Sequence, residues 1–144
     1  MKTFILICLF AASIWGAKID EFAKEVNYLR DYNSALKIAK KEDKMIMFLL
    51  VADYCPWCKK FERKILKNSS VSSFVSKNFI PVVVDKKRDQ GLYPKEYNTP
   101  LIPTVYFIDP NSQKSLYKSV AYMKKREYIS NMNKALSIFK KKAK

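Results

Sequence analysis

Two cysteines separated by two residues constrain this chain more than any other feature of its sequence. They stand in Cys55-Pro56-Trp57-Cys58, between the apolar run Met45 to Val51 and a stretch whose apolar residues recur at helical spacing. A pair of thiols in this setting is typical of a redox-active dithiol. The sequence therefore predicts a strand that leads directly to a reactive cysteine pair at the start of a helix.

The position at the start of a helix accounts for the expected chemistry of the pair. Pro56 suits the first helical position, because its fixed φ is already helical and its missing N–H has no intrahelical partner there. Cys55 is then the N-cap residue, where the unpaired N–H groups of the first turn and the positive end of the helix dipole favour a thiolate. Cys58 lies one turn inside the helix, within reach of a mixed disulfide on Cys55. We therefore expect Cys55 to be the nucleophile and Cys58 the resolving thiol.

Two other uses of a cysteine pair remain as alternatives. A structural disulfide that closes so short a loop restricts the unfolded chain only slightly and adds little stability. A structural zinc site usually takes four Cys or His ligands, whereas this sequence has no histidine and no second cysteine pair. We expect no metal, and no cofactor besides the disulfide between Cys55 and Cys58.

The first 17 residues have the pattern of a secretory signal peptide. Lys2 gives a charged start, the stretch from Phe4 to Trp15 is almost wholly apolar, and Gly16-Ala17 offers small residues for cleavage. The apolar stretch is short for a helix that spans a bilayer. An uncleaved membrane anchor and a lipid-modified Cys8 remain as alternatives. We expect cleavage and a periplasmic or secreted location.

The remaining chain, residues 18–144, has the size of one domain and can bury a core without needing cross-links. Without Lys2 it carries 27 lysine and arginine residues against 13 aspartate and glutamate residues, a net charge of +14. These positive charges are scattered in clusters, whereas a nucleic-acid-binding face would gather them beside base-stacking aromatics. We expect a solvated basic surface, a monomer and no nucleic-acid partner. Weak attraction to anionic lipid or acidic partners is the alternative.

Hydrophobic spacing predicts the order of the remaining elements. They are a helical lead-in at 20–24, an edge strand at 26–29, a helix from about 31–33 to 42, a buried strand at 45–51, a helix at 56–66, a short helix around 71–75, a strand at 79–84 followed by Asp85, a polar connection at 86–98 with a helical turn at 94–97, a hairpin with strands at 105–108 and 116–122, and a closing helix through Tyr128, Met132, Leu136 and Phe139. Pro81 favours either an edge position for its strand or a place near the start of that strand, because proline has no N–H to give to a ladder.

From about Val26 to Lys141 the chain resembles the thioredoxin superfamily. The matching features are a strand followed by Cys55-Pro56-Trp57-Cys58 and a helix, a strand ending at Asp85, Ile102-Pro103-Thr104 entering a hairpin, and a closing helix. Residues 33–41 and 52–55 are similar to secreted thioredoxin-like proteins related to the C-terminal domain of the membrane thiol transporter DsbD. The resemblance implies an α/β thioredoxin fold, with a central mixed sheet flanked by helices on both faces.

The resemblance also implies a substrate-binding loop beside the dithiol. In the superfamily the proline matching Pro103 is cis, and the residue matching Ile102 presents its backbone to the substrate chain. Such a cis bond is uncommon enough that it usually has a specific use. We expect Trp57, with Tyr54, to form an apolar rim for the substrate; packing of these rings onto the domain is the alternative.

Two acidic residues are candidates for proton transfer. Glu62 matches an acid of the DsbD-like domains, and its i+4 spacing places it on the same side of the helix as Cys58. The alternative is that Glu62 is an ordinary exposed helix residue. Many superfamily members have a buried acid six residues before the first cysteine, where this chain has Leu49. Asp53 is nearer to the dithiol, in the expected loop, and is the second candidate.

These features predict an exported thiol:disulfide oxidoreductase with one thioredoxin-like domain. Its expected substrates are cysteine-containing exported proteins, and a membrane thiol-electron transporter is a candidate redox partner. We favour a reductase, because the resemblance is to domains that pass electrons outward from such a transporter. A disulfide-forming oxidant and a binding or chaperone module on the same fold are the alternatives.

Overall fold

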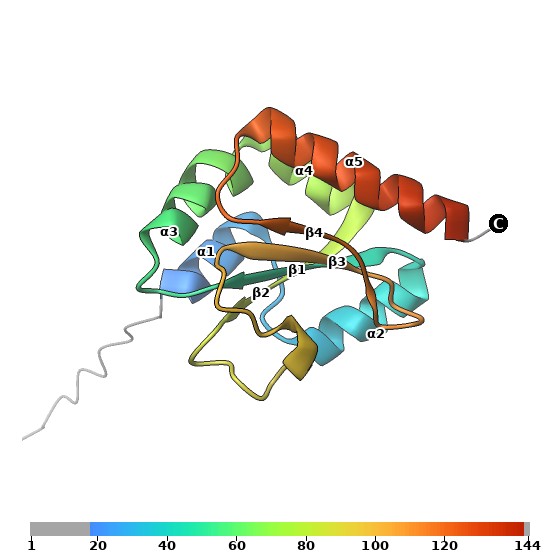
Figure 1. The fold of residues 1–144 in the computed structure, drawn as a ribbon, viewed down its shortest axis with the longest axis horizontal. Coiled ribbons are helices and arrows are strands. Elements are labelled where there is room, and N and C mark those ends of the chain that lie inside the picture. The colour runs from blue at the N-terminus through green and yellow to red at the C-terminus, as the bar shows by residue number, and fades with distance from the viewer. Residues whose placement is uncertain (1–17, 143–144) are drawn as a thin grey trace, which may run out of the picture.

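The computed structural model of the protein describes residues 18–142 (Figure 1). The α-helices are α1 (Lys18–Val26), α2 (Tyr32–Glu42), α3 (Pro56–Phe61), α4 (Ser69–Asn78) and α5 (Lys125–Lys142). A π-helical segment, η1 (Glu62–Leu66), continues α3, and η2 (Lys95–Tyr97) is a short 3-10 helix. The strands are β1 (Met45–Val51), β2 (Phe79–Asp85), β3 (Thr104–Ile108) and β4 (Ser115–Val120).

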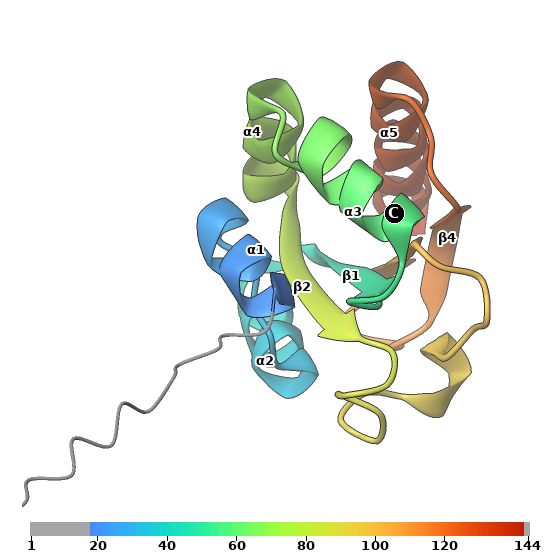
Figure 2. The same cartoon turned by 90° about the vertical axis from the view of Figure 1, so that its left-hand side faces the viewer.

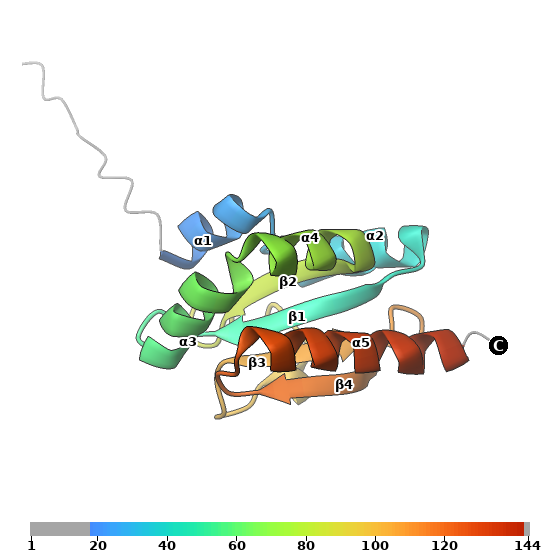
Figure 3. The ribbon, with the colours of Figure 1, turned by 90° about the horizontal axis from the view of Figure 1, so that it is seen from above.

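The four strands form one mixed sheet in the order β2-β1-β3-β4. β1 is parallel to β2 and antiparallel to β3, and β3 is antiparallel to β4. Every residue of β1 is fully buried, which agrees with its unbroken apolar sequence and its position inside the sheet. Figure 3 shows that α3 begins at the end of the sheet to which β1 points, so this central strand positions the cysteine motif.

The sheet separates two apolar clusters, and helices cover both of its faces. Alternate residues of β1, including Met47 and Leu49, pack in one cluster with buried side chains of α1, α3, α4 and α5. The residues between them, including Phe48, pack with α2 on the other face. Figure 2 shows α3, α4 and α5 on one side of the sheet and α2 on the other. The predicted α/β thioredoxin fold is therefore confirmed.

The face that α2 covers is completed by aromatic side chains rather than by a second long helix. The ring of Phe48 lies 5.4 to 6.2 Å from four tyrosine rings. These belong to Tyr32, Tyr93, Tyr97 and Tyr106. Two of the four come from the connection at 86–98, which the sequence analysis described as polar. Because its tyrosines are buried, that connection is part of the core.

The outer side of β2 has its backbone N–H groups occupied. Leu29 donates its N–H to the carbonyl of Pro81 at 2.9 Å and accepts the N–H of Val83 at 2.9 Å. Backbone groups alternate between the two sides of a strand, so Phe79 and Asp85 also face outward. Their N–H groups donate to the Val75 carbonyl and the Asp89 carboxylate. Pro81 has no N–H; it lies near the start of the edge strand β2, so both positions predicted for it are found.

Two predictions about local structure need correction. The edge strand expected at 26–29 is wrong, because α1 continues to Val26 and Leu29 makes only an isolated bridge to Val82. α1 buries Ile19 and Phe22 on one side, and this amphipathic packing carries the helix to Val26, where the strand was predicted to begin. The predicted helix at 56–66 is continuous, but its last five residues are π-helical.

None of the helices within residues 18–142 is long and apolar enough to cross a membrane. The predicted signal peptide at residues 1–17 lies outside the described residues and stays a prediction.

Candidate active site

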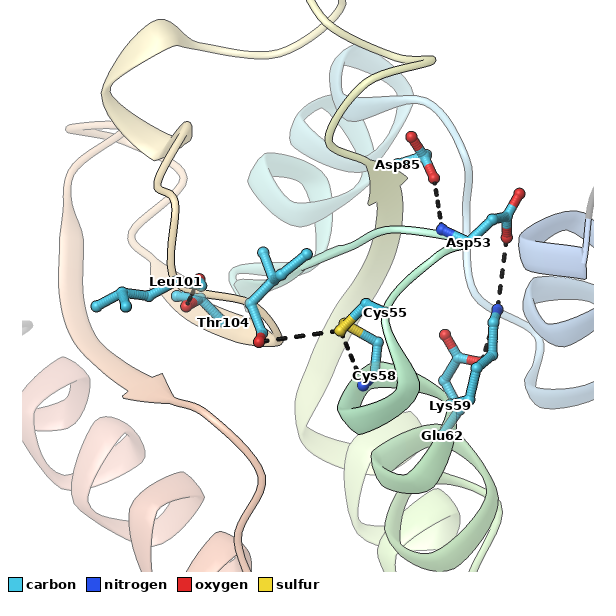
Figure 4. Close-up of a disulfide and its surroundings, with 9 residues drawn as sticks. Asp53, Cys55, Cys58, Lys59, Glu62, Asp85, Leu101 and Thr104 are labelled. Atoms are coloured by element: carbon cyan, nitrogen blue, oxygen red, sulfur yellow. Dashed lines mark hydrogen bonds and ion pairs between the residues drawn. A yellow bond between two sulfur atoms is a disulfide. The ribbon is translucent and has the colours of Figure 1, made fainter.

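The two cysteines of the motif form a disulfide at the start of α3 (Figure 4). Their Cα atoms are 5.2 Å apart. As predicted, Cys55 is the N-cap residue and Pro56 is the first residue of the helix. The N–H of Cys58 donates to the Sγ of Cys55 at 3.1 Å. The first turn of the helix therefore directs an N–H group at the sulfur expected to be the nucleophile, which favours negative charge there.

The two sulfurs differ in access to solvent. Cys58 is fully buried, whereas Cys55 is 8% exposed. Leu49 is fully buried in the apolar cluster that includes Cys58, at the position where many superfamily members have an acid. A partner that approaches from solvent therefore meets Cys55 first.

The loop before β3 lies beside the Sγ of Cys55. The peptide bond between Ile102 and Pro103 is cis, as the resemblance implies. The carbonyl oxygen of Ile102 is 4.0 Å from the Sγ of Cys55. This is a contact rather than a hydrogen bond, because a disulfide sulfur carries no proton. The Oγ1 of Thr104 donates to the carbonyl of Leu101 at 2.6 Å and holds the turn of this loop (Figure 4).

Glu62 is buried, so the alternative that it is an ordinary exposed residue is wrong. Its Oε2 lies 3.4 Å from the Nζ of Lys59. Its Oε1 is buried and, among the described residues, has no hydrogen-bond partner. Burial raises the pKa of Glu62, and the neighbouring Lys59 opposes this shift only in part. The carboxyl group therefore holds a proton more readily than an exposed glutamate does.

Within the described part of the chain, the side chain of Asp53 forms an ion pair with Lys59 and no hydrogen bond with either sulfur. Its side chain is exposed, and its Oδ1 lies 3.4 Å from the Nζ of Lys59. Lys59 therefore bridges Asp53 and Glu62, and the structure brings both predicted proton-transfer candidates to one lysine (Figure 4).

Asp85 is an organising residue that the sequence analysis did not assign to the site. Its carboxylate accepts the backbone N–H groups of Asp53, Lys87 and Arg88 at 3.0, 2.8 and 2.9 Å. Burial raises the pKa of Asp85, but these three donors outweigh it and leave the pKa below its usual range. The sequence held a signal for this role. Asp85 ends a strand parallel to the strand before the cysteine motif, and neighbouring parallel strands end at the same edge of a sheet, so its place near the motif could have been predicted.

Two exposed aromatic residues, Tyr54 and Trp57, are neighbours of the cysteines in the sequence. Trp57 is 56% exposed, and its ring centroid lies 5.7 Å from that of Tyr122. The Nζ of Lys60 is 4.8 Å from each of these two ring centroids. Tyr54 is 61% exposed, with the Nζ of Lys87 5.0 Å from its ring centroid. Trp57 thus both packs on the domain and contributes to an exposed rim, so the two expectations for it are compatible.

Within residues 18–142, no group of three or more His, Cys, Asp or Glu side chains is placed to hold a metal ion. The reactive groups that the site brings together are the two sulfurs. A mixed four-stranded sheet with a Cys-X-X-Cys disulfide at the first turn of a helix defines a thioredoxin-fold protein with a thiol-disulfide centre.

The chain belongs to the thioredoxin-like family, whose family model matches residues 27–110. This match includes the dithiol, the Ile102-Pro103 loop and β3. An uncharacterized protein of Archaeoglobus fulgidus is 23% identical over 87 residues, which are 60% of this chain and 68% of that protein.

Solved structures share the fold. A DsbH oxidoreductase matches with a TM-score of 0.63 and 24% identity over 76% of this chain and 83% of its own. A thioredoxin from Thermus thermophilus matches with a TM-score of 0.65 and 19% identity over 76% of this chain and 86% of its own. The oxidised C-terminal domain of DsbD from Neisseria meningitidis matches with a TM-score of 0.59 and 20% identity over 75% of this chain and 98% of its own.

Proposed function

We propose that the protein is an exported thiol:disulfide oxidoreductase that acts as a reductase of cysteine-containing proteins. The observation that carries the exchange chemistry is the unequal exposure of the two cysteines, and the resemblance to domains that pass electrons outward from a membrane transporter supports the reducing direction. Cys55 keeps a small exposed surface, 8%, beside the Ile102 carbonyl, and Cys58 is fully buried one helical turn behind it. A disulfide that only stabilises the fold needs neither this asymmetry nor a substrate-facing loop.

Cys55 starts the reaction in the reduced protein. Its thiolate attacks one sulfur of a substrate disulfide, and the other substrate sulfur leaves as a thiolate and takes a proton from solvent. Cys58, after losing its own proton, attacks the Sγ of Cys55 in this mixed disulfide. The Cys55–Cys58 disulfide forms, and the second substrate sulfur leaves and is protonated. Two electrons have then passed from the protein dithiol to the substrate, and the two substrate sulfurs have each taken up a proton.

Glu62 is the group that we assign to accept the proton of Cys58. It is buried on the same helix, and the burial that raises its pKa increases its affinity for a proton. Asp53 acts on this proton transfer indirectly, because Lys59 forms ion pairs with the carboxylates of both Asp53 and Glu62. Pro103 and Ile102 shape the loop that faces the mixed disulfide, and Trp57 supports the substrate chain.

A membrane thiol-electron transporter is the proposed source of electrons. Its dithiol would reduce the Cys55–Cys58 disulfide by the same two exchange steps in reverse, and would itself become a disulfide. The similarity in fold to the C-terminal domain of DsbD supports this partner. The signal-like sequence of residues 1–17 supports a periplasmic or secreted location for the encounter.

A disulfide-forming oxidant is the second candidate function. The helix N-terminus at Cys55 favours the thiolate, and stabilising the reduced form makes a disulfide more oxidising. A binding or chaperone module is the third, and the exposed Trp57 and Tyr54 favour it.

The reduction potential, combined with one variant, separates these functions. Equilibration with glutathione buffers should give a potential nearer to about −270 mV, the thioredoxin value, than to about −120 mV, the DsbA value. Rapid acid trapping of cells should find the protein mostly as the dithiol, and Cys55→Ser should abolish disulfide exchange. A potential near the oxidising end with mostly disulfide in the cell would identify an oxidant. Full biological activity of the Cys55→Ser protein would identify a binding module.

A further inference from the structure

We propose that Lys60 and Lys87 select partners whose reactive cysteine lies in an extended segment with aspartate or glutamate on both sides of it. The inference rests on the proposed function, since it names the class of substrate that the dithiol meets. It follows from two lysine-aromatic pairs beside Cys55, which we call the basic rim: Lys60 with Trp57 and Lys87 with Tyr54.

The two aromatic residues of the basic rim stand on either side of Cys55 in the sequence. Tyr54 immediately precedes Cys55, and Trp57 follows it by two residues. Lys87 reaches Tyr54 from the turn after β2, whereas Lys60 reaches Trp57 from α3. A segment bound across Cys55 would therefore have one ammonium group near each of its two arms.

Both ammonium groups of the basic rim are free to pair with a partner. In the ion pairs formed among residues 18–142, neither Lys60 nor Lys87 has a carboxylate partner. The nearby acids are already engaged, because Asp53 pairs with Lys59 and Asp85 is buried under three N–H donors.

The surroundings of the two lysines favour a carboxylate over other ligands. Each ammonium lies over the face of an exposed ring, so a bound segment can cover the ring with an apolar side chain while its acid reaches the ammonium. The whole chain has a net charge of +15, which attracts acidic partners and repels basic ones at long range. An acidic segment is therefore favoured twice: by long-range attraction during its approach and by contact with the two ammonium groups once it is bound.

Peptide binding to the oxidised protein tests this preference without any exchange reaction. Three peptides differ only at the positions two residues before and after a central serine, which replaces the cysteine, and carry Glu, Gln or Lys there. Quenching of Trp57 fluorescence reports binding. Each exposed charge pair is worth a factor of about two to three, so the Glu peptide should bind about fivefold more tightly than the Gln peptide. The Lys peptide should bind most weakly.

Variants separate the basic rim from the overall charge. Lys60→Gln/Lys87→Gln should remove the preference for Glu over Gln. Lys40→Gln/Lys41→Gln removes the same charge at the end of α2, before the start of β1 and away from the dithiol, and should keep the preference. Equal binding of the Glu and Gln peptides by the natural protein, or equal loss of preference in both variants, would overturn the inference.

Two further measurements distinguish other outcomes. If Lys60→Gln/Lys87→Gln loses binding to phosphatidylglycerol vesicles but not the peptide preference, the lysines serve a membrane surface and the inference is wrong. Cysteine versions of the three peptides, supplied as disulfides to the reduced protein, test the proposed function separately. If the reduced protein reduces none of the three peptides, the proposed reductase function is rejected, even where the serine peptides show the charge preference.

Discussion

Asp85 accepts the backbone N–H of Asp53 at 3.0 Å, which ties the end of β2 to the loop that carries Cys55. The same carboxylate accepts two N–H groups of the turn after β2. That turn is held further by Asp89, which accepts the N–H of Asp85 and pairs with Arg30 at 2.8 Å. The loop before the dithiol and the turn that carries Lys87 are therefore fixed relative to each other by one side chain.

Asp85→Asn should lower the free energy of unfolding by about 1 to 3 kcal/mol, because hydrogen bonds to a charged acceptor are replaced by weaker ones and one acceptor oxygen is lost. Urea unfolding of the oxidised protein measures this. Asp43→Asn is the matched control, because Asp43 is exposed at the end of α2 and asparagine tolerates its left-handed backbone. An equal effect of the two changes would show that Asp85 contributes no more than surface charge.

The contribution of Asp85 should depend on pH in a defined direction. Its pKa is lowered in the folded protein, so its stabilising effect is complete above the ordinary aspartate pKa of about 3.9. The effect is lost as the pH falls through the lower folded value. The difference in stability between the natural protein and Asp85→Asn should therefore narrow in acid. A difference that widened in acid would contradict the direction of this shift.

Glu62→Gln should stabilise the oxidised protein at neutral pH, because it removes a carboxylate whose burial raises its pKa. Above the raised pKa of folded Glu62, ionisation of the buried carboxyl lowers the stability of the folded protein. This loss of stability disappears below the ordinary glutamate pKa of about 4.3, where the carboxyl is protonated in both states. The gain seen in urea unfolding at pH 7 should therefore vanish near pH 4. A loss of stability at pH 7 would show that the pair with Lys59 outweighs the burial.

The same variant should slow the reaction if Glu62 takes the proton of Cys58. The lifetime of a mixed disulfide on Cys55 should lengthen in Glu62→Gln, with little change in the rate at which that disulfide forms. Stopped-flow measurement of both steps checks this. Equal slowing of the two steps would assign Glu62 to the general geometry of the site rather than to the resolving thiol.

Alkylation of the reduced protein should modify Cys55 before Cys58. Cys55 is accessible at the helix N-terminus and Cys58 is fully buried, so the rates should differ by about tenfold or more. Brief iodoacetamide treatment followed by peptide mapping measures the two rates, and Cys58→Ser should trap mixed disulfides with partners. Preferential labelling of Cys58 would reverse the roles of the two sulfurs.

Phe48→Ala should cost about 3 to 5 kcal/mol, because it leaves a cavity among four tyrosine rings on the face that α2 covers. Urea unfolding measures the change. Ile138→Ala on the exposed side of α5 is the control and should stay within about 0.5 kcal/mol. A small effect at Phe48 would mean that the connection at 86–98 can collapse onto the sheet.

Features set by neighbours in the chain were predictable from the sequence. β1 was bounded by its apolar run, and the N-cap position of Cys55 followed from Pro56. Features that need distant segments were not predictable. The burial of Glu62 depends on α1, whose residues line a surface hollow with it, and the stacking of Trp57 depends on Tyr122. No local pattern reports such contacts.

The occupied outer side of β2 limits how copies of this protein can join through their sheets. A strand of another molecule would find no free N–H there, because Leu29, Asp89 and the end of α4 accept the donors and Pro81 has none. Among the described strands, only β4 has an edge without such a partner. Addition of strands at one edge stops at a pair of molecules, whereas a fibril requires two usable edges. The fold thus blocks the growth of a continuous intermolecular sheet at β2.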